Sequence, residues 1–210
     1  MMPVDLNVLA AFTLASFACV MSPGPDTVLI LRHTLVSGRK VGLAAVAGVQ
    51  VGLLGHTLLA VAGISVLIAT SPTAFKFVTI IGAAYLAWLG VGAIRGAGAL
   101  ALDVGGGETG PLKAGCDAVL TNLLNPKVIV LFLALFPNFV ETGRGDETAQ
   151  LLTLAAALIV INTLWQTPIA LAAGAVRRWL SSDVARRRVS ILSGIIFIGF
   201  AIGLLAQHLG

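Results

Sequence analysis

The chain has 210 residues, of which 58% are hydrophobic and only 10% are charged, and its mean hydropathy is +1.00. Because a typical soluble domain has about 25% charged residues, this composition excludes most soluble enzymes and binding modules. The formal net charge of +4 and a pI of about 9.6 fit a partner that is either nucleic acid or a membrane surface.

Six apolar segments are each long enough to cross a bilayer, whose hydrocarbon core about 30 Å thick needs roughly 20 apolar residues per helix. In chain order the predicted helices are Leu6–Leu31, Val41–Thr70, Ala74–Ile94, Cys116–Val140, Ala149–Ala175 and Val189–Gln207. Asp5 stands where a signal peptide would carry basic residues, so we interpret the first segment as a retained helix. The sequence therefore predicts an all-α polytopic membrane protein with six transmembrane helices.

The cations alternate between the two sides of this predicted layout. Ten of the thirteen Lys and Arg residues lie in the connections after the first, third and fifth helices. The opposite connections carry only Lys76 and Arg144, and Lys127 lies within the fourth helix. The positive-inside rule then puts both termini on the outer, periplasmic side of a bacterial inner membrane. An even number of helices likewise requires both termini to lie on one side, and the alternation favours a lipid bilayer over nucleic acid as the partner.

Each half of the chain would contribute three helices, so a duplicated second half would enter the membrane upside down. The segment 25–31 weakly matches the segment 126–132, and both begin with proline. Inverted-repeat transporters place interrupted helices at corresponding points of both halves, near the bilayer midplane. We therefore expect one membrane transport domain with two inverted three-helix repeats, repeat 1 at 1–95 and repeat 2 at 116–210, joined by a cytoplasmic connector at 96–115.

A double-proline break interrupts the first predicted helix. The break consists of Ser22, Pro23, Gly24 and Pro25. These four residues and the nearby Thr27 are candidate substrate contacts. The prolines remove two backbone donors, so the carbonyls of Cys19 and Met21 lose their usual helical partners. Pro25 suits the first position of a new half-helix, whose N–H groups at residues 26–28 would then point into the break and attract an anion.

A second break lies in the fourth predicted helix, at Asn125-Pro126-Lys127. Pro126 frees the carbonyl of Asn122, and the side chains of Asn122 and Asn125 can satisfy backbone groups or contact a solute. Two simple kinks are the structural alternative. A matched pair of breaks favours a shared solute site, and we expect the two breaks to approach each other within about 20 Å, roughly two helix diameters.

Asp26 and Lys127 are the acidic and basic residues well inside the predicted spans. Each charge costs at least about 2.5 kcal/mol at a bilayer centre unless it is paired or hydrated. The functional hypothesis is a clamp for a zwitterion, with Asp26 on the substrate ammonium and Lys127 on its carboxylate, and with Asp26 also the proton-coupling group. The alternative is a permanent structural ion pair between the two.

Four further polar residues lie within the spans and are candidates for lining the solute pathway: Gln50, His56, Asn162 and Gln166. The i, i+4 spacing of the last two puts them on one face of the fifth helix. Hydrogen bonding between neighbouring helices is the structural alternative for all four. Gly199 and Gly203 form a GxxxG pair that fits either a homodimer face or packing within one chain.

Several motifs are characteristic of a known family. They are Ser22-Pro23-Gly24-Pro25-Asp26-Thr27, Asn122-Leu123-Leu124-Asn125-Pro126-Lys127, Leu135-Phe136-Pro137-Asn138-Phe139 and Gly82-Ala83-Ala84-Tyr85-Leu86-Ala87-Trp88-Leu89-Gly90. With them the chain resembles the LysE/RhtB family of bacterial amino-acid exporters over essentially its whole length. The resemblance implies efflux of amino acids or close derivatives coupled to proton influx, and six helices in two inverted halves.

Within that family, the segment 47–52 with His56 after it looks most like the branch that exports homoserine, homoserine lactone and threonine. The fifth helix of family members often carries an acidic residue near Asn162. An amide at that position puts proton coupling there in doubt and leaves Asp26 as the chief candidate.

Other classes of function fit the sequence less well. An intramembrane enzyme would need a motif such as His-Glu-x-x-His or Gly-x-Ser-x-Gly, and the chain has neither. A metal-ion exporter would need clustered carboxylates, thiols or imidazoles within the spans. The three His residues and the two Cys residues are scattered instead. We therefore expect no enzymatic activity, metal site or cofactor.

Overall fold

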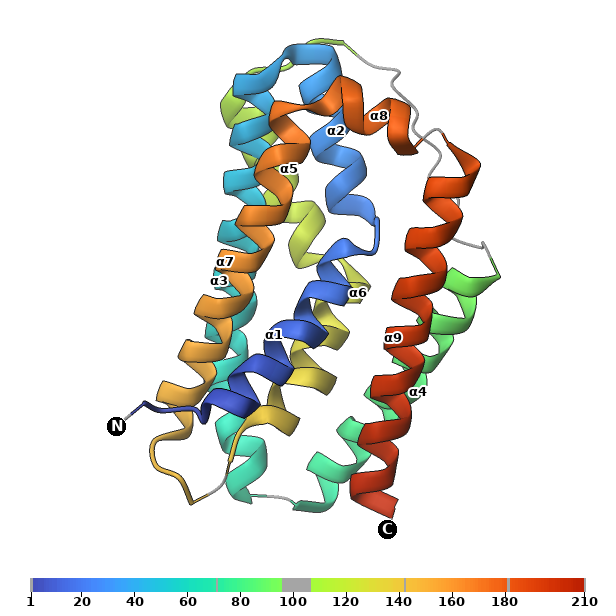
Figure 1. Cartoon of the computed structure of the whole chain (residues 1–210). Coiled ribbons are helices and arrows are strands. Elements are labelled where there is room, and N and C mark those ends of the chain that lie inside the picture. The colour runs from blue at the N-terminus through green and yellow to red at the C-terminus, as the bar shows by residue number, and fades with distance from the viewer. Residues whose placement is uncertain (1, 71, 96–106, 142, 181, 210) are drawn as a thin grey trace.

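The computed structural model describes residues 2–70, 72–95, 107–141, 143–180 and 182–209, and every regular element within these ranges is helical (Figure 1). The α-helices are α1 (Leu6–Met21), α2 (Pro25–Ser37), α3 (Arg39–Thr70), α4 (Pro72–Ile94), α5 (Pro111–Leu123), α6 (Pro126–Val130), α7 (Glu147–Leu171), α8 (Ala173–Leu180) and α9 (Asp183–Leu209). A π-helical turn, η1 (Leu131–Leu135), and a 3₁₀ turn, η2 (Phe136–Phe139), follow α6. The all-α prediction is confirmed for these residues.

The prediction of six membrane spans is confirmed only in part. Within the described residues, α7 and the stretch Arg39–Gly63 of α3 are long and apolar enough to cross a membrane. Two bent pairs also qualify when each is counted as one span, α1 with α2 and α5 with Pro126–Phe139. The described structure therefore contains two such spans, or four with the bent pairs included.

Both predicted breaks are present as sharp bends at proline. The chain turns by 54° between α1 and α2 and by 50° between α5 and the segment that begins at Pro126. Pro25 and Pro126 each occupy the first turn of the new helix, where a missing N–H is harmless. Gly24 precedes α2 in an extended conformation, and the Asn125 side chain caps α6 by accepting from the Lys127 N–H at 3.1 Å.

Several helix boundaries differ from the sequence prediction. Helix α2 continues to Ser37, beyond the predicted end at Leu31, and α9 begins at Asp183, before the predicted start at Val189. The predicted fifth helix, Ala149–Ala175, is divided at Ala172 into α7, which contains Pro168 and ends at Leu171, and the separate short helix α8. The helix α5 begins at Pro111 rather than at Cys116, with Gly110 at its N-cap. Residues 96–106 of the predicted connector lie outside the described residues.

Glycines allow two helix pairs to approach closely. A Cβ on Gly52 of α3 would lie 2.6 Å from the Oδ1 of Asn122 on α5. A Cβ on Gly90 of α4 would lie 2.8 Å from the carbonyl oxygen of Gly194 on α9. Figure 1 shows α4 and α9 side by side, and the start of α1 and the end of α9 toward the same end of the molecule.

Two apolar clusters surround a layer of polar side chains. The larger cluster joins Phe12 with the aromatic rings of η1 and η2, where Phe132 and Phe136 stack at 4.2 Å between ring centroids. The smaller cluster joins α2 and the first turns of α3 with the end of α7. On α7, Leu158 belongs to the first cluster and Ile169 to the second, so Asn162 and Gln166 lie between them.

Candidate functional site

The two breaks lie against each other and exchange hydrogen bonds. The Nδ2 of Asn122, before the second break, donates to the Oδ2 of Asp26, after the first, at 2.9 Å. The Nζ of Lys127, after the second break, donates to the carbonyl oxygens of Ser22 at 2.7 Å and Cys19 at 3.1 Å. The prediction that the breaks meet is therefore confirmed, and about a hundred residues of sequence separate the partners in each bond.

Lys127 replaces the backbone donors that the first break lacks. Pro23 has no N–H for the carbonyl of Cys19, as the sequence predicts, and the ammonium of Lys127 occupies that place. Gly24 leaves room for it, because a Cβ there would lie 3.2 Å from Nζ. The expectation for Val28 is wrong, since its N–H donates to the Gly24 carbonyl at 3.1 Å and does not point freely into the break.

Asp26 is buried, with 7% of its surface exposed, at the start of α2. Its Oδ2 accepts from Asn122, but its Oδ1 is buried without a hydrogen-bond partner. Among the ion pairs of the described residues, none joins Asp26 to Lys127 within 4.0 Å. The alternative of a direct structural ion pair therefore has no support in this structure.

A small cavity of about 30 Å³ lies where the breaks meet α7. Its polar lining comes from both breaks and from α7, namely Gly24, Asp26, Thr27, Lys127, Asn162 and Gln166. A water molecule occupies about 30 Å³ in the liquid, so the cavity has room for one or two waters and not for an amino acid. The cavity must therefore widen before it can hold an amino acid.

Helix α7 adds amide groups to the cavity wall. Asn162 is buried, with 6% of its surface exposed, and its Oδ1 has no hydrogen-bond partner. The Oε1 of Gln166 accepts from the Nε2 of Gln50 at 3.3 Å. A buried acceptor that lacks a donor costs roughly 1–3 kcal/mol. Asn162 and Asp26 therefore present two unmatched acceptors near one cavity, whereas Gln50 reaches it only through Gln166.

His56 lies outside this cavity and supports the second break. Its Nε2 lies 3.2 Å from the carbonyl oxygen of Asn122, the group that Pro126 deprives of its helical donor. Its ring stacks on Phe132 with centroids 5.3 Å apart. The remaining predicted residues do not line this cavity. Gln50 hydrogen-bonds Gln166, and the others shape or support the breaks: Ser22, Pro23, Pro25, His56, Asn122, Asn125 and Pro126.

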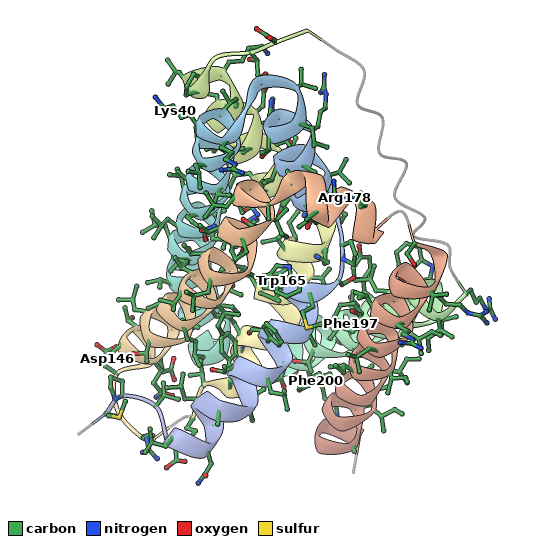
Figure 2. All side chains as sticks on the ribbon, turned by 45° about the horizontal axis from the view of Figure 1, so that its top comes forward. Lys40, Asp146, Trp165, Arg178, Phe197 and Phe200 are labelled. Atoms are coloured by element: carbon green, nitrogen blue, oxygen red, sulfur yellow. The ribbon has the colours of Figure 1, made fainter. Side chains whose placement is uncertain are left out.

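A second, apolar cavity of about 270 Å³ adjoins the first break, and the sequence prediction missed it. Thr27 lines both cavities, and Met21 and Pro23 of the first break also line the second. Helix α7 contributes Trp165, which Figure 2 labels near the centre of the helix arrangement. The cavity depends on contacts with α8 and α9, so no local pattern in the sequence indicates it.

A helical membrane protein with matched breaks around a polar cavity has the architecture of a transporter. The family model described as "LysE type translocator" matches residues 17–208. The chain belongs to this LysE family of membrane transport proteins, as the sequence motifs indicate. No solved structure gives a significant match to the chain.

The relatives of this chain match it over nearly its whole length. An uncharacterized membrane protein of Vibrio cholerae is 34% identical over 93% of this chain and 95% of its own length. A homoserine/homoserine lactone efflux protein of Salmonella typhimurium is 31% identical over 90% of this chain and 91% of its own length. A leucine efflux protein of an Enterobacter species is 30% identical over 94% of each. Membrane transport in the efflux direction is therefore the activity that the family supports.

Proposed function

We propose that this protein is a secondary transporter that exports α-amino acids or close derivatives from the cytoplasm in exchange for protons. One observation carries the proposal: Asp26 and Lys127, on opposite breaks, line one polar cavity without forming an ion pair within 4.0 Å. Because charges within a membrane are costly and mark functional sites, we infer that each of the two binds one end of a solute during transport.

The zwitterion clamp assigns one end of the solute to each break. The unpartnered Oδ1 atoms of Asp26 and Asn162 accept from the substrate ammonium. The ammonium of Lys127 exchanges the carbonyls of Cys19 and Ser22 for the substrate carboxylate. Solute binding would then release these two carbonyls, so binding is coupled to the shape of the first break.

Proton coupling is assigned to Asp26. Asp26 supplies the carboxyl group among the side chains that line the cavity. Asn162 on α7 is an amide, which does not titrate. A protonated Asp26 would bind an ammonium poorly, so a proton and a solute compete for one group. Such competition is the requirement for antiport.

Because the polar cavity is too small for an amino acid, transport requires it to widen and to open to each side in turn. We propose six helices in two inverted repeats, residues 1–95 and 116–210, that move against each other. The 54° and 50° bends and the two prolines that begin α2 and α6 support this symmetry. The segment 96–115 would be the cytoplasmic connector of a single transport domain.

We place the protein in the bacterial inner membrane with both termini periplasmic, because Lys and Arg concentrate in cytoplasmic loops. In Figure 2, Lys40 and Arg178 lie toward one end of the molecule and Asp146 toward the other. A reporter fused before Met2 or after the last helix should be accessible from the periplasm. Accessibility from the cytoplasm alone would reverse the topology and the inverted-repeat pairing.

The sequence alone favours homoserine-like and threonine-like solutes, because the segment around His56 resembles one family branch. Two relatives are named for efflux of homoserine and its lactone and for efflux of leucine, which are solutes with different side chains. His56 supports the second break and does not line the polar cavity. The group common to these solutes, an α-amino group beside a carboxyl group, is therefore what the clamp recognises.

Counterflow in proteoliposomes tests the proposal. Purified protein should exchange radiolabelled amino acids against a panel of unlabelled amino acids and homoserine lactone, and should accumulate them when a proton gradient is imposed. Empty liposomes are the control for exchange, and liposomes with Asp26→Asn protein are the control for proton-driven accumulation. Exchange of divalent metal ions without exchange of any amino acid would overturn the proposal in favour of a metal-ion exporter.

A further inference from the structure

The apolar cavity beside the first break has no role in the zwitterion clamp. It encloses about 270 Å³ between the break, α7, α8 and α9. Its wall is apolar except for the side-chain hydroxyl of Thr27 and the indole N–H of Trp165. A volume just below the roughly 300–1,000 Å³ of pockets for drug-sized ligands suits a solute of amino-acid size.

We propose that this cavity is the subsite for the substrate side chain and that it selects amino acids with bulky aliphatic side chains. The inference rests on the proposed function, because the clamp must hold the ammonium and the carboxylate first. Thr27 lines both cavities and follows Asp26 directly. A zwitterion held at Asp26 therefore extends its side chain past Thr27 into the apolar cavity.

The position along α7 supports this continuity. Asn162 and Gln166 line the polar cavity, and Trp165 and Ile169, three residues further along in each case, line the apolar one. Residues at this spacing lie on adjacent strips of one helix face. The two cavities therefore lie next to each other on α7, so that one amino acid can place its charged groups in the first and its side chain in the second.

The chemistry of the wall decides the class of side chain. Burial of aliphatic groups is favourable in proportion to the area removed from water, whereas a hydroxyl group buried with few hydrogen-bond partners loses free energy. Leucine-like solutes should therefore bind more tightly than alanine, and more tightly than homoserine. Because one methylene group changes selectivity by about 10-fold or more in an apolar pocket, the difference between leucine and alanine should reach at least about 10-fold.

Filling the cavity tests the inference in the full-length protein. Val189 of α9 is a buried lining residue, and Val189→Phe narrows the cavity, while Val184→Phe on the same helix is the matched control at a 60% exposed position outside it. Counterflow competition by leucine, alanine and homoserine is measured for each variant. We expect Val189→Phe to weaken the apparent affinity for leucine about 10-fold and to change the affinity for alanine by no more than about twofold. Val184→Phe should change neither affinity.

An equal loss for leucine and alanine, or none for either, would overturn the side-chain subsite, as would wild-type protein that exchanges alanine and homoserine but not leucine. In all these cases the proposed export function would stand. Wild-type protein that exchanges no amino acid would instead refute the export function itself, and the subsite with it.

A labelling experiment covers the case in which Val189→Phe does not fold. Val176 of α8 also lines the cavity, so Val176→Cys is introduced together with Cys116→Ser, which removes the exposed native thiol. Leucine should slow the reaction of the new thiol with N-ethylmaleimide at least about 10-fold more effectively than alanine. Equal protection by both, or protection by neither, indicates a different occupant such as a lipid chain and overturns the inference.

Discussion

The ammonium group of Lys127 lies 2.7 Å from the carbonyl oxygen of Ser22, so a residue that follows one break donates to a carbonyl within the other. Asn122 and Asp26 form the converse link, from a residue before the second break to one after the first. The two breaks are thus joined reciprocally. We therefore expect a change at either one to affect the other, as an alternating-access transporter requires.

Asp26→Asn should abolish proton-driven accumulation and spare counterflow. The amide oxygen can still accept from Asn122 and from a substrate ammonium, but the side chain no longer titrates. Accumulation is measured in proteoliposomes with an imposed pH gradient, and counterflow in the same vesicles without one. Asp117→Asn, on α5 and outside the polar cavity, is the control. Proton-driven accumulation by Asp26→Asn protein would assign the coupling to another group.

Lys127→Gln should weaken the binding of solutes with a free carboxylate more than the binding of homoserine lactone, which lacks that anion. Charge-assisted hydrogen bonds are worth roughly 1.5–3 kcal/mol, so we expect a loss of about 10-fold or more for homoserine. Competition assays with homoserine and its lactone compare the two solutes directly. The same factor for both would mean that Lys127 acts on the break alone. The carbonyls of Cys19 and Ser22 also lose their charged donor, so the melting temperature should fall.

The double variant Asp26→Asn, Lys127→Gln separates the clamp from a structural ion pair. If the two charges stabilised each other, removing both would restore what either single change loses. Since no ion pair joins them within 4.0 Å, we expect the double variant to be no better than the worse single variant in transport. Melting temperatures and proton-coupled uptake of all three variants decide this. Full recovery in the double variant would refute the clamp.

Gly52→Ala should impair folding and transport because the added Cβ would lie 2.6 Å from the Oδ1 of Asn122. The clash would push Asn122 away from Asp26 or separate α3 from α5, at a cost of typically 1–3 kcal/mol. Thermal unfolding in detergent and counterflow measure both effects. Gly92→Ala on α4 is the matched control, since a Cβ there meets nothing within 4 Å. Equal behaviour of the two variants would contradict the close approach of α3 and α5.

Gly199 and Gly203 are expected to form a homodimer face. A Cβ at either position meets nothing within 4 Å in this chain, so these glycines do not serve packing between the described helices of one copy. Gly203→Leu should lower the dimer fraction, measured by light scattering in detergent, without lowering the melting temperature of the monomer. Gly63→Leu on α3, also without neighbours, should leave the dimer fraction unchanged. A monomeric wild-type protein would contradict the dimer.

The sequence by itself determined the all-helical class of the chain and the two places where the helices break. Long apolar runs exclude other secondary structure in a bilayer, and the effect of a proline is confined to the turn that contains it. Pro25 and Pro126 therefore predict the starts of α2 and α6 to the residue. Local rules also predicted that the Cys19 carbonyl would need a new partner, and the family motifs predicted membership of the LysE family.

Only the tertiary structure decided which side chains meet. Lys127 binds backbone carbonyls and not Asp26, and His56 supports the Asn122 carbonyl and does not line the polar cavity. These contacts depend on the bend angles of 54° and 50° and on how α3 packs against α5. No short-range pattern encodes such quantities, because they follow from the packing of helices far apart in sequence. The small polar cavity and the apolar cavity beside it also follow from this packing.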